Sequence, residues 1–255
     1  MILAGLLLIA APASDLPICT DRPAKANSVC TVPPGRWQVE TSGVGWSRAT
    51  NRGAVVESLS LGSSLAKFGL GDRSDIQVGI TPFVQVSASE AGQRGRLSGF
   101  GDVVVRYKHR LSSDGAPVQV ALVPFVKLPT ARRGIGNRKV EGGLAVPVSV
   151  PLSASMAVTF GPEVDLVADA AGEGRHFALV NLVNLLAPVA PRLTLAGEIW
   201  TNVNFDPAGT VKQASADGAF AYSASDDLQL DLGANFGLTR DTPDIEVYAG
   251  FSIRL

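Results

Sequence analysis

Residues 75–86 read DIQVGITPFVQV, and the alternation in this stretch decides the fold class. From Ile76 to Val86 every second residue is apolar, whereas the residues between are mostly polar or glycine. A period of two places successive side chains on opposite faces of a strand. The stretch therefore predicts a β-strand with one apolar and one polar face.

The same period continues through most of the chain. Residues 118–128, 228–238 and 245–255 repeat it, and Gly-, Pro-, Ser- and Asp-rich turns separate such segments. The pattern predicts an all-β, antiparallel fold with about twelve strands, near residues 36–48, 55–70, 74–88, 99–111, 117–129, 138–150, 153–167, 174–187, 191–205, 211–224, 227–239 and 243–255. The Gly- and charge-rich stretch 89–98 is expected to be one of the longer loops.

A soluble sandwich and a closed transmembrane barrel both fit alternating strands. Sandwich strands usually run about five or six residues, whereas these segments are about thirteen residues long, as membrane-spanning strands with extensions are. Charged residues also lie in the middle of the polar faces. We therefore predict an up-and-down β-barrel in the bacterial outer membrane, with residues 35–255 as the barrel domain, an apolar outside and a polar inside.

Composition excludes several other classes. A net charge of −1 gives no field that would attract nucleic acid. Two histidines and two cysteines are too few for a multi-histidine or zinc-cage site. The mean hydropathy of +0.22 is high for a soluble protein. We expect no metal, no other cofactor and no nucleic-acid partner.

The first 34 residues predict export. Residues 1–13, MILAGLLLIAAPA, resemble the apolar region and small-residue cleavage site of a signal peptide. Residues 14–34 are expected to form a periplasmic segment, and no plug domain is expected. In an oxidising compartment Cys19 and Cys30 are predicted to form a disulfide; the alternative, a redox pair, lacks the short C-x-x-C spacing.

Three motifs carry a family resemblance. GFGDV at 99–103 opens a strand that ends RYKHRL at 106–111, PFVKLPT follows at 124–130, and YAGFSIRL closes the chain at 248–255. Together they resemble the outer-membrane transporter family linked to the meta-cleavage pathway of phenol degradation. The resemblance implies an outer-membrane barrel that passes small hydrophobic or aromatic compounds, and it brings no catalytic residues.

The expected partners follow from this interpretation. They are outer-membrane lipid, a small-molecule solute and the barrel-assembly machinery, which reads the alternating C-terminal strand. The oligomeric state stays open.

Charged side chains of the polar face form the first candidate site. Basic residues lie on neighbouring strands and acidic residues on later ones, so that a basic wall would face an acidic wall across the lumen. The alternative is a lumen filled by mutual salt bridges. The candidate residues of the solute pathway are Arg106, Lys108, Lys127, Glu163, Asp165 and Glu198.

Aromatic residues form the second candidate site. Phe83, Phe125, Trp200 and Tyr248 fall on the nominally inward face, where they could line a path for planar solutes. Prolines directly before both phenylalanines leave an alternative open, because a bulge there would shift the register and turn a ring outward.

The predicted function is a channel for passive uptake of small hydrophobic or aromatic solutes. One alternative is a structural barrel without transport. The other is a lipid-modifying barrel enzyme using Ser153 or Ser155 with His176, which is disfavoured because no G-x-S-x-G motif occurs.

Overall fold

A computed structural model describes residues 17–51, 53–153 and 155–255. The predicted signal peptide, residues 1–13, lies outside these residues. Across the described chain, no helix is long and apolar enough to cross a membrane.

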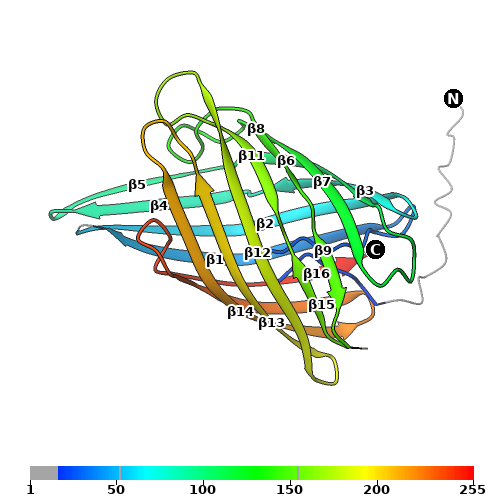
Figure 1. Ribbon diagram of the computed structural model, residues 1–255. Helices are drawn as coiled ribbons and strands as arrows, with labels where there is room; N and C mark the ends of the chain where they lie inside the picture. The colour runs from blue at the N-terminus through cyan, green and yellow to red at the C-terminus, as the bar shows by residue number, and fades with distance from the viewer. Residues whose placement is uncertain (1–16, 52, 154) are drawn as a thin grey trace, which may run out of the picture.

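The strands form one closed antiparallel β-barrel (Figure 1). The first strand, β1, pairs with both β2 and the last strand, β16, which closes the sheet into a ring. The strands are β1 (Trp37–Asn51), β2 (Ala54–Gly71), β3 (Ser74–Ile80), β4 (Phe83–Glu90), β5 (Gln93–Gly99), β6 (Val103–Arg110), β7 (Gln119–Leu128), β8 (Glu141–Ala145), β9 (Val148–Pro151), β10 (Ala157–Phe160), β11 (Glu163–Ala168), β12 (Arg175–Ala190), β13 (Leu193–Asn204), β14 (Val211–Ser225), β15 (Leu228–Gly237) and β16 (Ile245–Arg254).

Sixteen strand segments make twelve barrel strands. Four barrel strands are interrupted, so β3 continues as β4, β5 as β6, β8 as β9 and β10 as β11. Three of the interruptions contain a proline, Pro82, Pro147 or Pro162, which cannot donate to the ladder and so breaks the pairing. The predicted twelve-strand, all-β barrel is confirmed.

The stretch 89–98 differs from the prediction. It is not a loop: β4 and β5 run through it and pair from Val84–Gly99 to Glu90–Gln93. The turn consists of Ala91 and Gly92, with φ values of 47° and 83°, as a tight two-residue hairpin turn requires. In Figure 1 this hairpin projects beyond the neighbouring strands, which explains its polar, charge-rich sequence.

The two ends of the barrel differ. The C-terminus lies at the end that holds the connections 72–73, 111–118, 191–192 and 226–227 (Figure 1). The opposite end holds the 12-residue loop 129–140 and loops of six or seven residues at 169–174, 205–210 and 238–244, whereas three of the four connections just named have two residues. Short connections face the periplasm and longer ones face outward in outer-membrane barrels, so we call these the inner end and the outer end.

Burial is inverted relative to a soluble protein. The exposed large residues are mostly Leu, Val, Ile and Phe of the outer surface, whereas Gln38, Lys67, Gln77 and Lys108 are among the most buried side chains. A closed barrel with an apolar outside satisfies its backbone internally and can lie in lipid. The fold and this distribution place the protein in the bacterial outer membrane.

Leu232 and Leu238 test this placement as a matched pair. Both side chains are similarly exposed, at 58% and 59%, but Leu232 is in the middle of β15 and Leu238 follows its outer end. We expect Leu232→Arg to lower the free energy of unfolding in bilayers by about 2–4 kcal/mol and Leu238→Arg by about 1 kcal/mol or less. Denaturant titration of folded protein in vesicles measures both. Equal losses would contradict the depth assigned to β15.

Candidate functional site

Residues 17–34, which we call the lumen segment, lie inside the barrel. Asp21 bonds to Lys67 of β2 and Lys108 of β6, whereas Lys25 bonds to Asp217 of β14. β6 and β14 lie on opposite sides of the twelve-strand ring. The segment therefore crosses the lumen. The prediction that these residues lie in the periplasm was wrong, because an ordered ionic network holds them inside the barrel.

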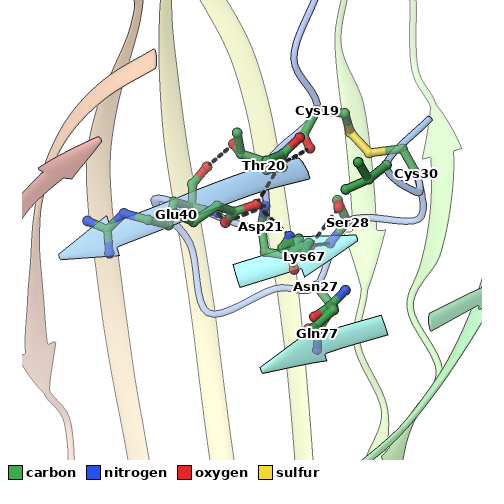
Figure 2. Close-up of polar contacts among 12 residues, drawn as sticks. Cys19, Thr20, Asp21, Asn27, Ser28, Cys30, Glu40, Lys67 and Gln77 are labelled. Atoms are coloured by element: carbon green, nitrogen blue, oxygen red, sulfur yellow. Dashed lines mark hydrogen bonds and ion pairs between the residues drawn. A yellow bond between two sulfur atoms is a disulfide. The ribbon is translucent and has the colours of Figure 1, made fainter. Parts of the chain in front are cut away.

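The Cys19–Cys30 disulfide is present, as predicted, and closes the loop that enters the lumen (Figure 2). Gln38 of β1 donates to the Cys19 carbonyl at 2.9 Å. At the other end of the loop, the Val32 amide donates to Asp75 of β3 at 3.0 Å. The disulfide and these bonds hold both arms of the loop near the inner end of the barrel.

Asp21 occupies the basic side of the lumen (Figure 2). Its carboxylate is 2.6 Å from the Lys67 ammonium and 2.7 Å from that of Lys108. Lys67 also pairs with Glu40 of β1 at 2.5 Å, and Glu40 accepts bonds from the Asp21 and Arg22 amides. Lys67 and Lys108 are almost fully buried. Burial alone would raise the pKa of Asp21, but the two ammonium groups outweigh it and hold that pKa well below its usual range.

Arg22 and Lys25 occupy the acidic side. The Arg22 guanidinium makes two bonds to the Asp231 carboxylate of β15, and Lys25 is 2.5 Å from Asp217. Glu198 of β13 accepts from the Lys25 and Ala26 amides at 3.1 and 3.0 Å. The predicted basic and acidic walls are thus present, and each is matched by opposite charge or by amide groups of the segment.

Two predicted aromatic residues also contact the segment. Trp200 of β13 faces inward, with the Lys25 ammonium 4.9 Å from its ring centre. The Tyr248 hydroxyl of β16 donates to the Pro23 carbonyl at 2.8 Å, and Arg22 lies over its ring. Both are cation–π arrangements.

The two phenylalanines take opposite faces. Phe125 faces inward because it pairs with Arg106, which bonds to Asn27 of the segment. Phe83 pairs with Leu61, whose side chain is 41% exposed on the outer surface, so its ring faces lipid. The inward placement of Phe83 was wrong. Between the buried Lys67 and the exposed Leu61, β2 reverses which face its alternate side chains take, at Gly62 with φ of 68° and opposite the break at Pro82, while the register with β3 and β4 stays the same.

The remaining predicted pathway residues face the lumen but form separate groups. Lys127 of β7 pairs with Asp102 at 3.2 Å and Glu141 at 2.9 Å, which is a salt bridge between wall residues. Glu163 and Asp165 of β11 border a cavity of about 310 Å³ with Arg106 and Lys25. The sequence did not identify Asp21, Arg22 or Lys25, because a short polar segment carries no periodic signal.

The positions of the candidate serines and of His176 argue against the enzyme alternative. His176 lies at the outer end of β12, bonded to Asp169 at 2.7 Å and to Asn204. Ser153 and Ser155 follow β9 at the inner end. The serines and His176 therefore occupy opposite ends of the barrel. Among the described residues, no group of three His, Cys, Asp or Glu side chains could hold a metal ion.

Comparison with known proteins agrees with this architecture. The model of the family described as "Putative MetA-pathway of phenol degradation" matches residues 20–255. The chain belongs to this family. No curated protein sequence matches the chain significantly.

Several solved structures share the fold. The COG4313 outer membrane channel from Pseudomonas putida F1 superposes with a TM-score of 0.73 and 13% identity, over 91% of this chain and 100% of that one. The NanC porin gives 0.57 with 11% identity, over 86% and 100%. The translocator domain of the autotransporter NalP from Neisseria meningitidis gives 0.55 with 11% identity, over 88% and 90%. At these identities the likeness concerns the fold.

Asp21→Asn tests the ionic docking of the lumen segment. The change leaves the buried Lys108 without its ion-pair partner, and removing one partner of a buried pair costs about 3–5 kcal/mol. Lys67 keeps its ion pair with Glu40. We therefore expect a cost at the lower end of this range, about 3 kcal/mol, which corresponds to about a hundredfold faster amide exchange in residues 20–32. Hydrogen exchange with mass spectrometry measures this. Asp226→Asn, at an exposed turn, is the control; equal exchange in both variants would contradict the assignment.

The pKa of Asp21 predicts how this effect depends on pH. A lowered pKa gives a contribution that is complete above the ordinary range for aspartate and is lost only as the pH falls through the lowered value. The difference in exchange between wild type and Asp21→Asn should therefore be the same at pH 7 and pH 5. Exchange rates corrected for intrinsic pH dependence provide the measurement. A difference that vanishes by pH 5 would show that Asp21 is not held by both lysines.

Proposed function

We propose that this protein is a passive channel for the uptake of small solutes, and that aromatic solutes with a polar group are its preferred class. The observation that carries the proposal is the arrangement of free space in the lumen. Three cavities, of about 310, 450 and 250 Å³, border the lumen segment, and Lys25 lines all three. A solute entering from the outer end would meet Lys25 before it reached the inner end of the barrel.

The chemistry at this point supports the solute class. Trp200 offers a ring face beside Lys25, and Arg106, Asn202, Glu163 and Asp165 add polar groups around the same cavity. Charged walls disfavour a purely apolar solute, whereas a small aromatic molecule with a hydroxyl or carboxylate can use both the ring and the charges. The resemblance of the fold to an outer membrane channel supports transport as well.

A structural barrel without transport is the second candidate. The observation that favours it is the ionic network itself, because the segment is held on both walls by buried groups. If the three cavities do not connect past Lys25, the lumen is sealed. Solute flux distinguishes these candidates.

Flux into liposomes with benzoate, catechol and aliphatic solutes of similar size provides the test. We expect wild type to pass the aromatic solutes faster than empty vesicles do. Lys25→Met should raise flux severalfold, since it removes a cation with its hydration from the point that all three cavities share, whereas Lys212→Met at the outer rim should leave it unchanged.

Phe125→Ala examines the aromatic preference. It should reduce the advantage of aromatic over aliphatic solutes, and Phe220→Ala, which removes an equivalent ring from the lipid face, should not. Flux equal to empty vesicles for wild type and for Lys25→Met would favour the structural barrel and reject the channel.

A further inference from the structure

The outer surface carries a groove that the lumen pathway does not use. It has a volume of about 440 Å³ and lies along β8, between β7 and β11. Gly142 forms its floor, because it pairs with Val126 on one side and Leu166 on the other, and both of those side chains face outward. The groove thus lies where Gly142 has no side chain, in an otherwise continuous apolar surface.

The wall behind the groove is closed. The ladder is in register on both sides of Gly142, from Lys127–Glu141 to Val123–Ala145 and from Leu166–Gly142 to Glu163–Ala145. A Cβ at Gly142 would lie 2.6 Å from the Phe125 carbonyl oxygen, so the close approach of the backbones requires glycine there. The groove is a surface depression and not a window into the lumen.

The lining is apolar along its length and basic at one end. Val140, Val126, Leu144, Val164, Leu166 and Phe177 supply the apolar surface. Arg175, the first residue of β12, lies at the end nearest the outer rim, exposed, with one guanidinium nitrogen bonded to the Val140 carbonyl. Within the described residues, the guanidinium, which has five N–H donors, makes this one hydrogen bond.

The adjoining loop strengthens the positive charge. Residues 129–140, PTARRGIGNRKV, contain four basic residues and no acidic residue, and the loop leads directly into β8. Lys139 is paired with the exposed Glu173 at 3.3 Å, whereas Arg133 and Arg138 are exposed. The chemistry at this end of the groove therefore suits an anion.

We propose that the groove binds an acyl chain of a phosphorylated glycolipid of the outer leaflet, with Arg175 on a phosphate. Both requirements meet in one place: an apolar slot at outer-leaflet depth and an arginine at its outer end. Arginine binds phosphate through paired, charge-assisted hydrogen bonds, and basic sites beside membrane-facing surfaces recognise lipid head groups. The lipid would hold the β7–β8 loop and the β11–β12 hairpin against the membrane surface.

Native mass spectrometry of the full folded chain in detergent tests the proposal. The probes are a bisphosphorylated hexa-acyl glycolipid of the lipid A type, its dephosphorylated form and phosphatidylglycerol. We expect the bisphosphorylated glycolipid to bind at least tenfold more tightly than either of the others. Equal binding of all three probes would overturn the proposal.

Matched variants locate the site. Arg175→Gln should weaken binding about tenfold, whereas Arg192→Gln should not, although Arg192 is likewise exposed and bonded to one backbone carbonyl, at the inner end. Val126→Trp should fill the groove and weaken binding to a similar degree, and Val247→Trp on the lipid face of β16 should not. Leu166→Ala provides a second groove variant if the tryptophan prevents folding.

The contrary outcomes are specific. The site would be rejected if Arg175→Gln bound the bisphosphorylated glycolipid as tightly as Arg192→Gln does. It would also be rejected if both groove variants bound it as tightly as Val247→Trp does. Because lipid binding is measured without transport, failure of the channel proposal would leave this result unaffected.

Discussion

The structure of the lumen depends on the match between two charged walls and one short segment. Without the segment, Lys108 on one side and Asp217 and Asp231 on the other would lose the ion-pair partners that they have in the described structure. Asp21 meets the basic wall, and Arg22 and Lys25 meet the acidic wall. A buried charge is costly unless it is paired, so the segment and the walls stabilise each other's position.

This pairing also explains why the barrel interior can be so polar without collapsing. Wall residues such as Lys127, Asp102 and Glu141 satisfy one another locally. The groups near the inner end instead find partners from a segment anchored by the Cys19–Cys30 disulfide and by Gln38 and Asp75. The segment therefore cross-links the lumen from its anchors at the inner end, and the three cavities lie beside the segment around Lys25.

The strands could be predicted from the sequence because the lipid and the lumen impose a period of two over many residues. The same logic placed Trp200, Tyr248 and Phe125 correctly, but it failed at Phe83, because the alternation of faces reverses between Lys67 and Leu61, at Gly62 and the break at Pro82. It failed differently for residues 17–34. Their position depends on contacts between residues up to about two hundred positions apart, such as Arg22 with Asp231, and no local pattern encodes such a contact. The hairpin at 89–98 was mistaken for a loop because strands beyond the membrane need no apolar face.

The two faces of the barrel near β8 illustrate how one backbone can serve both environments. Gly142 faces lipid and Gly143 faces the lumen, where the Phe125 ring and the Asp165 carboxylate fold over it. Side chains are thus absent at successive positions on opposite faces. The ladder nevertheless remains paired on both sides, because unpaired backbone groups in lipid are too costly to tolerate. Because this constraint keeps the wall intact at β8, the route that we propose for solutes runs through the lumen past Lys25, and the outer depression is accessible only to a molecule that approaches from the membrane.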